Sequence, residues 1–292
     1  MIIALAGLGG ILNGTYLHGC ILSSKSTDKV EGGQGRDGSL LGRFGQGMGI
    51  IHGRERERES GEYSILNGAK TLQSFYYVDD FTEKQVIPRS KLFLLDSGAF
   101  TFFGQGKKVD WNEYISNYSE FIRKNNVKHF FELDIDPLVG YQRVLEMRQT
   151  LERLTDQPSI PVWHRSRGKD EFVKMCKEYD YVAIGGIVTR EITPDQWKIF
   201  PTLIDIAHKH GARIHGLGFT SLKDLPKYHF DSVDSTSWTS GNRFGNIHTF
   251  DGRGNIIVTK RPEGMRIADP RRTARHNFTE WKKFSDWAEV HL

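Results

Sequence analysis

Polar and glycine residues stand at the ends of a series of short apolar segments. Each segment is typical of a β-strand that is buried on both faces. Several carboxylates in one site suit a reaction in which one acts as the nucleophile and another donates and then accepts a proton. A pair of this kind catalyses substitution at glycosidic bonds through a covalent glycosyl-enzyme intermediate. The strand-end residues are Asp96-Ser97-Gly98, Asp134-Ile135-Asp136, His164, Gly185-Gly186, His215-Gly216 and Asp234-Ser235.

The same residue types at strand ends are also compatible with structural and metal-binding roles. Asp and Gly after strands commonly form helix caps and turns. Carboxylates also bind Mg²⁺ in phosphohydrolases, but Asp134 and Asp136 alternate along a predicted strand and should point to opposite faces. His164 and His215 would suit zinc, although buried, hydrogen-bonded histidines are commoner. We therefore predict a site without a metal.

Apolar strands and amphipathic helices alternate along most of the chain. This alternation indicates parallel βα units. For 292 residues the predicted fold is a (β/α)8 barrel of the TIM type, and an open doubly wound sheet is the alternative. A barrel would bring the carboxyl ends of all its strands to one face, where the polar residues would form a single site. The predicted strands are 92–96, 129–134, 160–164, 181–185, 213–217 and 232–234, and the predicted helices are 111–125, 141–154, 169–178 and 193–210.

Composition narrows the class of protein further. Hydrophobic residues make up 38% of the chain, which is enough for a sizeable core and excludes wholesale disorder. The net charge of +4 permits contact with nucleic acid without requiring it. Only Cys20 and Cys176 are present, so a disulfide scaffold and a Cys-rich zinc site are excluded, and a cytoplasmic protein is predicted. The apolar start, residues 1–12, is too short for a membrane span and is predicted to be the first strand.

Two segments differ in composition from the rest of the single predicted domain, residues 1–292. Residues 23–61 are rich in glycine and charge and are predicted to form a flexible insertion, with a phosphate-binding loop as the alternative. Residues 260–292 combine a basic segment with a predicted helix over 278–290. Arginines on such surfaces suit phosphate contacts, and a solvated basic face is the alternative. The candidates for contact with a nucleic-acid backbone are Arg165, Arg167, Arg243, Arg271 and Arg272.

The strand-end motifs, taken in order between residues 92 and 252, resemble those of the tRNA-guanine transglycosylase superfamily, which includes the queuine tRNA-ribosyltransferases. The family's Asp-Ser-Gly-Gly-Phe/Tyr motif is similar to Asp96-Ser97-Gly98-Ala99-Phe100, and its Gly-Gly-Leu motif to Gly185-Gly186-Ile187. Its Met-Gly-Val-Gly segment resembles His215-Gly216-Leu217-Gly218. About nineteen residues separate the family's nucleophilic Asp from a Trp-Asp-Gly motif. Here Asp234 to Gly252 is nineteen residues and ends in Phe250-Asp251-Gly252.

The resemblance implies a role for each matching residue. Asp234, in preference to Asp231, would be the nucleophile, and Asp96 the general acid and base. Phe100 and His215 would flank a purine base. The remaining contacts to the base would come from Asp134, Asp136, His164, Gly185, Gly186, Ile187 and Gly216.

Departures from the family pattern bear on the choice between DNA and tRNA as the substrate. Ser237-Trp238-Thr239-Ser240 replaces a Pro-Thr-Arg motif, His164 replaces a Gln, and two cysteines cannot form the family's zinc subdomain. The chain is most similar to the short DNA-directed members encoded by phages and bacterial genomic islands, the 7-deazaguanine DNA transglycosylases.

The function implied is replacement of guanine in DNA by a 7-deazaguanine, such as the 7-cyano compound, in the cytoplasm of a bacterial or phage-infected cell. The free 7-deazaguanine base is the co-substrate, and no other cofactor and no membrane contact are expected. The resemblance does not identify a partner protein that opens the DNA. The alternatives are the same exchange on tRNA, a non-catalytic nucleic-acid-binding barrel, and a metal-dependent sugar or phosphate hydrolase.

Overall fold

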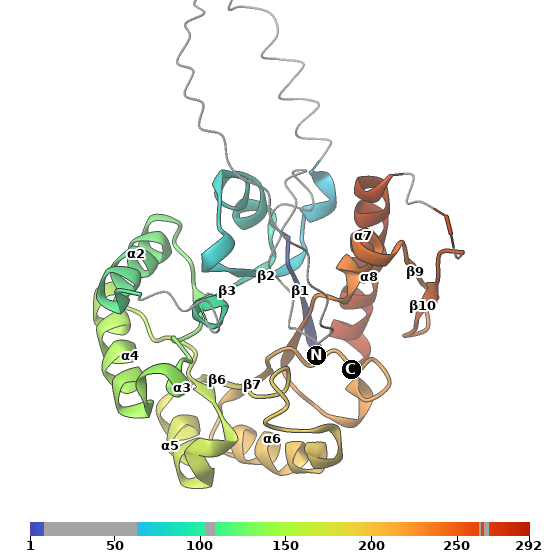
Figure 1. Cartoon of the computed structure of the whole chain (residues 1–292). Helices are drawn as coiled ribbons and strands as arrows, with labels where there is room; N and C mark the ends of the chain where they lie inside the picture. Colours follow the sequence, from blue (N-terminus) through green and yellow to red (C-terminus); the bar gives the residue numbers. More distant parts are fainter. Residues whose placement is uncertain (9–62, 103–108, 263, 266–268) are drawn as a thin grey trace, which may run out of the picture.

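The computed structural model describes residues 1–8, 63–102, 109–262, 264–265 and 269–292. Eight parallel strands form one curled sheet in the order β4-β3-β2-β1-β8-β7-β6-β5 (Figure 1). The two outer strands, β4 and β5, are joined by a parallel bridge between Phe131 and Ile160. This arrangement is compatible with the predicted TIM-type fold. The strands are β1 (Ile2–Ala6), β2 (Lys70–Ser74), β3 (Leu92–Asp96), β4 (His129–Phe130), β5 (Val162–Trp163), β6 (Tyr181–Ile184), β7 (Arg213–Gly216) and β8 (Ser232–Ser235).

Helices surround the outside of the curled sheet (Figure 1). The four predicted between 111 and 210 are all present, and the last is divided into a 3-10 segment, Pro194–Ile199, followed by α6. Pro201, which lacks a backbone N–H, occupies the first turn of α6, and this explains the division at Phe200. The helices are α2 (Trp111–Lys124), α3 (Asp136–Val139), α4 (Tyr141–Thr155), α5 (Gly168–Glu178), α6 (Phe200–Lys209), α7 (Ser240–Phe244) and α8 (Pro270–His291).

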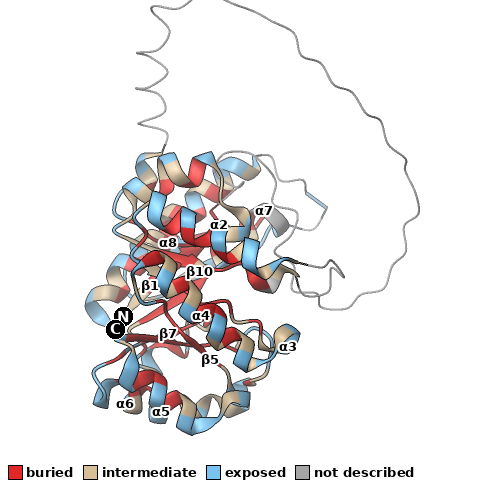
Figure 2. Cartoon of the chain, turned by 90° about the vertical axis from the view of Figure 1, so that its left-hand side faces the viewer, coloured by how far each residue is buried: buried red, intermediate tan, exposed pale blue. Residues whose placement is uncertain are grey.

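Side chains on the strands alternate between the inside of the curled sheet and its helix-covered outside. On β1, Ala4 and Ala6 belong to an inner cluster, whereas Ile3 and Leu5 belong to an outer core shared with the helices. Figure 2 shows the same layering, with buried strands enclosed by helices whose outward sides are exposed. The other buried members of the inner cluster are Leu72, Leu94, Phe131, Ile160, Val162, Tyr181 and Ala183.

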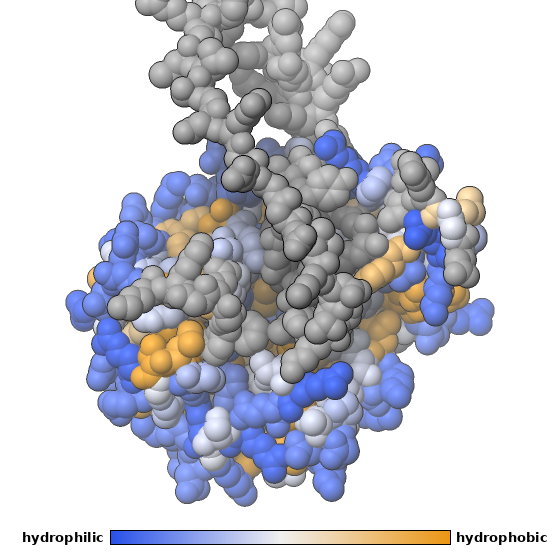
Figure 3. Space-filling model, in the orientation of Figure 1, coloured by the Kyte–Doolittle hydropathy of each residue, from blue (hydrophilic) through white to orange (hydrophobic). Residues whose placement is uncertain are grey.

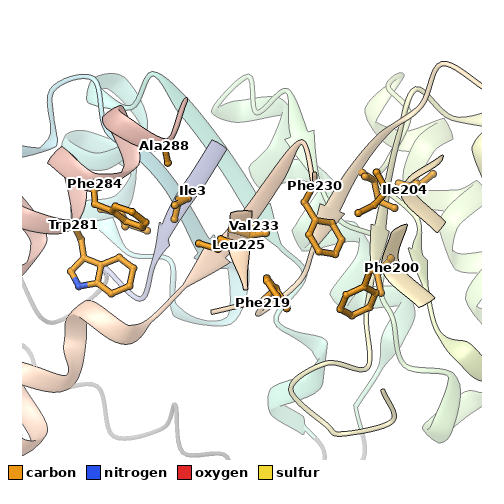
Figure 4. Packing of buried hydrophobic residues seen from close by; sticks show 14 of the residues in the cluster. Ile3, Phe200, Ile204, Phe219, Leu225, Phe230, Val233, Trp281, Phe284 and Ala288 are labelled. Atoms are coloured by element: carbon orange, nitrogen blue, oxygen red, sulfur yellow. The ribbon is translucent and has the colours of Figure 1, made fainter. Parts of the chain in front are cut away.

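The carboxyl-terminal helix α8 packs against β1. Trp281, Phe284 and Ala288 of α8 lie beside Ile3 in the outer core (Figure 4). The helix predicted over 278–290 is therefore present, and it begins earlier, at Pro270, where the Asp269 side chain accepts a hydrogen bond from Arg272 N (2.9 Å). Proline at the first helical position and an Asp cap are typical of a helix start.

A buried lysine fixes the direction of α8 relative to the sheet. Lys70, at the amino end of β2 and 2% exposed, pairs with Asp286 (2.8 Å) and Glu289 (2.9 Å). Lys91, just before β3, also pairs with Glu289 (2.8 Å). The end of α8 thus lies at the amino ends of the strands, and its first turn points toward their carboxyl ends.

A hairpin of two antiparallel strands, β9 (Ile247–Phe250) and β10 (Ile256–Thr259), lies beside α8 and was not predicted. Its inner side packs through Phe250 on Phe284 and Trp287. Its outer side leaves Ile247 and Ile257 exposed, and Figure 3 shows hydrophobic surface in this region.

The segment 23–61 and Cys20 lie outside the described residues. Cys176 is a buried free thiol. Among the described helices, none combines the length and hydrophobicity needed to cross a membrane.

Candidate active site

Three carboxylates from three strands meet at the carboxyl ends of the sheet. Asp96 ends β3, Asp134 follows β4, and Asp234 is the last but one residue of β8. The proximity of the other two carboxylates contributes to a raised pKa of Asp96. Burial, reinforced by the negative charges of Asp134 and Asp234, raises the pKa of Asp96 from 3.8 to about 7. The structure therefore brings Asp96, Asp134 and Asp234 together at one end of the sheet.

The turn after β3 holds Asp96 in place. The Asp96 Oδ2 atom accepts a hydrogen bond from Gly98 N (3.1 Å). Gly98 has φ +71°, and a Cβ there would lie 2.5 Å from Ser74 Oγ and 2.7 Å from Tyr76 N. Only glycine fits this turn without displacing β2. The Ser74 Oγ atom is buried and has no hydrogen-bond partner among the described residues, and Ser74 stands opposite Asp96 in the register of β2 and β3.

The carboxylate of Asp234 is held through one oxygen. Its Oδ1 atom accepts hydrogen bonds from Gly218 N (2.6 Å) and from His215 Nε2 (3.3 Å). Asp231, the alternative nucleophile, lies at the other end of β8, where its carboxylate accepts hydrogen bonds from Ile214 N (2.7 Å) and His208 Nε2 (2.9 Å). Of these two residues, only Asp234 lies at the end of the sheet that carries Asp96.

The side chain of His215 is enclosed by the sheet. Its side chain is 0% exposed, so it presents no surface on which a base can stack. It lies inside the sheet, where Nδ1 contacts Ser232 Oγ (2.6 Å) and Nε2 contacts Asp234. Inward-facing positions of β7 are enclosed by neighbouring strands, and the role of His215 beside a base stays a prediction.

His164 lies between two carboxylates. Its Nε2 atom is 3.4 Å from Asp134 Oδ2, and its Nδ1 atom is 3.0 Å from Glu191 Oε2. Burial by itself lowers the pKa of His164, but the two carboxylates outweigh it and raise the pKa to about 9. The imidazole is therefore a cation at neutral pH. Glu191 is fixed in turn by Ser166 N, which donates to its Oε1 atom (2.8 Å).

The glycine pair after β6 makes room for the His164–Glu191 pair. A Cβ on Gly185 would lie 2.7 Å from His164 Cε1. Gly186 has φ +77°, and a Cβ there would lie 2.9 Å from Glu191 Oε2. Ile187 follows, partly buried. The predicted glycine residues thus border the site, and Glu191, which was not predicted, completes it.

Gly216 faces the other way. A Cβ on Gly216 would meet Phe219 Cβ at 3.2 Å and the Phe230 ring at 3.3 Å. These aromatic residues belong to the outer core (Figure 4). Gly216 therefore allows close packing behind the sheet, and its side-chain position does not face the three carboxylates.

Asp136 and Arg167 pair with each other. Asp136 begins α3 and does not continue the predicted strand. Arg167 donates from Nε to Asp136 Oδ2 (2.6 Å) and from a terminal nitrogen to Glu132 Oε1 (2.8 Å). The side chain of Arg167 is 1% exposed, and its role as a contact for a nucleic-acid backbone stays a prediction. Its neighbour Arg165 is exposed.

The other predicted phosphate contacts are distributed around the same end of the sheet. Arg271 and Arg272 are exposed in the first turn of α8, which points toward the carboxyl ends of the strands. The side chains of Phe100 and Arg243 lie outside the described part of the structure.

Within the described ranges, no group of three or more His, Cys, Asp or Glu side chains is arranged to hold a metal ion. In comparisons with known proteins, no family model matched the sequence and no curated sequence matched it significantly. The fold and site thus define an α/β protein with a curled parallel sheet. Its site combines three carboxylates and a cationic histidine at the carboxyl ends of the strands.

Proposed function

We propose that the protein is a base-exchange transglycosylase that replaces guanine in DNA with a free 7-deazaguanine, such as 7-cyano-7-deazaguanine. The observation that carries this proposal is the contrast between two carboxylates at one end of the sheet. Asp96 has a pKa of about 7, and Asp234 accepts two N–H hydrogen bonds on one oxygen. Carboxylates whose environments differ in this way are suited to divide acid–base and nucleophilic roles.

The exchange proceeds by two displacements at the anomeric carbon. The target nucleotide is first extruded from its stack, because the glycosidic bond is not accessible within a duplex. Asp234 forms a bond to C1′ while the bond from C1′ to guanine N9 breaks, and Asp96 gives its proton to the leaving base. The incoming 7-deazaguanine then returns a proton to Asp96 as its N9 attacks C1′ and releases Asp234. The β configuration is retained.

Asp134 and His164 supply complementary hydrogen-bonding groups for the base. The Asp134 carboxylate can accept from the N–H groups of a guanine edge. His164 Nε2 is buried 3.4 Å from Asp134 Oδ2 and can donate to the neighbouring carbonyl oxygen of the base. A site built from buried polar groups discriminates strongly against a base that leaves them unpaired. Adenine, with its amino group at position 6, is rejected on this basis.

The proposal also includes a complete (β/α)8 barrel without the zinc subdomain of the tRNA enzymes. That subdomain supplies part of the tRNA surface in the family that the sequence resembles, so DNA is the favoured polynucleotide. The protein would act in the cytoplasm of a bacterial or phage-infected cell. The exposed Arg165, Arg271 and Arg272 would contact phosphates, and binding would weaken steeply with added salt.

The test is mass spectrometry of nucleosides from cells that make both the protein and 7-deazaguanine precursors. DNA and tRNA are digested separately. We expect a 7-deazaguanine nucleoside in DNA that disappears with Asp234→Asn and persists with Asp231→Asn, the matched change at the opposite end of β8. Modification found only in tRNA would move the activity to tRNA. No modification in either polymer, with salt-sensitive DNA binding retained by Asp234→Asn, would favour a non-catalytic binding protein.

A further inference from the structure

A line of hydrogen-bonded side chains runs through the inside of the sheet and ends on Asp234. The Tyr181 hydroxyl contacts Ser232 Oγ, Ser232 Oγ contacts His215 Nδ1 (2.6 Å), and His215 Nε2 contacts Asp234 Oδ1 (3.3 Å). All four residues are at most 8% exposed. Water is therefore largely absent from this line, and each polar atom in it depends on its protein partners.

The strand register explains why these residues meet. On β7 and β8, His215 stands opposite Ser232, and Asp234 follows Ser232 on the same face of its strand. Tyr181, at the start of β6, reaches the same interior, where small residues such as Ala183 leave space for large ones. The ring of Phe131 lies 5.2 Å from the imidazole, between centroids, and closes its other side.

The carboxylate at the end of the line sets the direction of every hydrogen bond. A carboxylate oxygen can only accept a hydrogen bond, so His215 Nε2 carries the proton in its contact with Asp234; in an imidazole with a single N–H, Nδ1 then carries none. The Nδ1 atom is then an acceptor, and the Ser232 hydroxyl must donate to it. The Ser232 oxygen can in turn accept from the Tyr181 hydroxyl, so that three donors point the same way.

We propose that Tyr181, Ser232 and His215 are positioning residues that hold the nucleophilic carboxylate, with His215 fixed as the Nε2–H tautomer. The nucleophilic role of Asp234 rests on the proposed function. The tautomer of His215 and the direction of the hydrogen bonds do not depend on that function. Both described donors to the carboxylate, His215 Nε2 and Gly218 N, fall on Oδ1. Restraining one oxygen orients the other for attack, which lowers the cost of reaching the transition state.

The first measurement is nitrogen NMR of the full-length protein with ¹⁵N-labelled histidine, between pH 6 and pH 8. The His215 signals are assigned by their loss in His215→Gln. We expect a protonated Nε2 and an unprotonated Nδ1, and a shift of the Nε2 signal in Asp234→Asn. A proton on Nδ1, whether as the other tautomer or as an imidazolium, overturns the proposal.

The second measurement separates kcat from KM for base exchange. His215→Met removes the donor and should lower kcat about 10- to 100-fold, with KM changed by less than about threefold, because a hydrogen bond to a charged group is lost. His215→Gln restores an N–H donor and should recover most of kcat. The matched control is His208→Met, which removes the comparable contact to Asp231 Oδ2 (2.9 Å) at the opposite end of β8 and should leave kcat unchanged.

The two measurements also separate the failure of this inference from the failure of the proposed function. If Asp234→Asn remains active, or if the wild type exchanges no base, the transglycosylase proposal fails. The NMR result for the His215 tautomer still decides in which direction the hydrogen bonds from Tyr181 to Asp234 run. If the wild type is active and His215→Met changes only KM, or nothing, the positioning role is refuted. Should His215→Met not fold, Ser232→Ala tests the same line by removing the donor to Nδ1.

Discussion

Replacing Asp96 by Asn should stabilise the protein at alkaline pH while it abolishes base exchange. The folded-state pKa of about 7 lies above the ordinary value of 3.8, and this difference corresponds to roughly 4 kcal/mol. Between these two pH values the folded state binds more protons than the unfolded state. The stability of the wild type therefore falls as pH rises toward 7 and levels off above it. Asn carries no charge and escapes this penalty.

The assay is urea unfolding at pH 5.5 and pH 8. From the two pKa values, the wild type should lose about 2 kcal/mol more than Asp96→Asn between these conditions. The exposed Asp205, changed to Asn, serves as the surface control and should follow the wild type. Parallel losses for the wild type and Asp96→Asn would refute this expectation, because they would mean that the charge of Asp96 is not opposed by burial and its neighbours.

Three further outcomes follow from named contacts. Changing His164 to Gln should lower the free energy of unfolding by about 2–3 kcal/mol below pH 6.5, because the folded protein stabilises the charged imidazole, as its raised pKa shows. Urea titrations at increasing pH should show this difference vanish as pH rises through about 9. Lys70→Met should lower the free energy of unfolding in urea by about 1–2 kcal/mol, because the Lys70 side chain is 1% exposed. Lys91 shares the partner Glu289 but is 58% exposed, so Lys91→Met should lower it by less than about 0.5 kcal/mol. Arg167→Leu should lower the free energy of unfolding by about 3 kcal/mol, because it removes a partner from the carboxylates of Glu132 and Asp136. Arg165→Ala should leave the unfolding midpoint unchanged and should weaken DNA binding at low salt.

The strands that could be predicted from sequence are those whose residues are nearly all apolar. The segment 92–96 became β3 with the predicted limits, and Leu94 and Leu95 are fully buried. By contrast, β2, with the sequence Lys70-Thr-Leu-Gln-Ser, was missed because its polar residues are buried through contacts distant in sequence. The partners of Lys70 are more than 200 positions away, and no local pattern reveals them.

The candidate site was predicted as a set of strand ends, but not the direction of each side chain. Asp96 and Asp234 lie at the same end of the sheet because both occupy inner positions at the carboxyl ends of their strands. The full burial of His215 was not predicted, since the sequence does not show which face of β7 is enclosed. Glu191 was missed because its pairing with His164 depends on the close approach of β5 and β6 at Gly185, which no local sequence pattern contains.

The weakest junction of the sheet lies next to Asp134 and His164, the two residues that we propose hydrogen-bond the base. Between β4 and β5 the strands are joined by one bridge, and the Glu132 carboxylate, fully buried, adds a contact by accepting from Val162 N (2.8 Å). Arg148 and Arg167 neutralise this carboxylate at 2.8 Å each. Asp134 follows Glu132 by two residues, and His164 follows Val162 by two. The ionic cluster at this junction therefore holds the two strands together where Asp134 and His164 emerge.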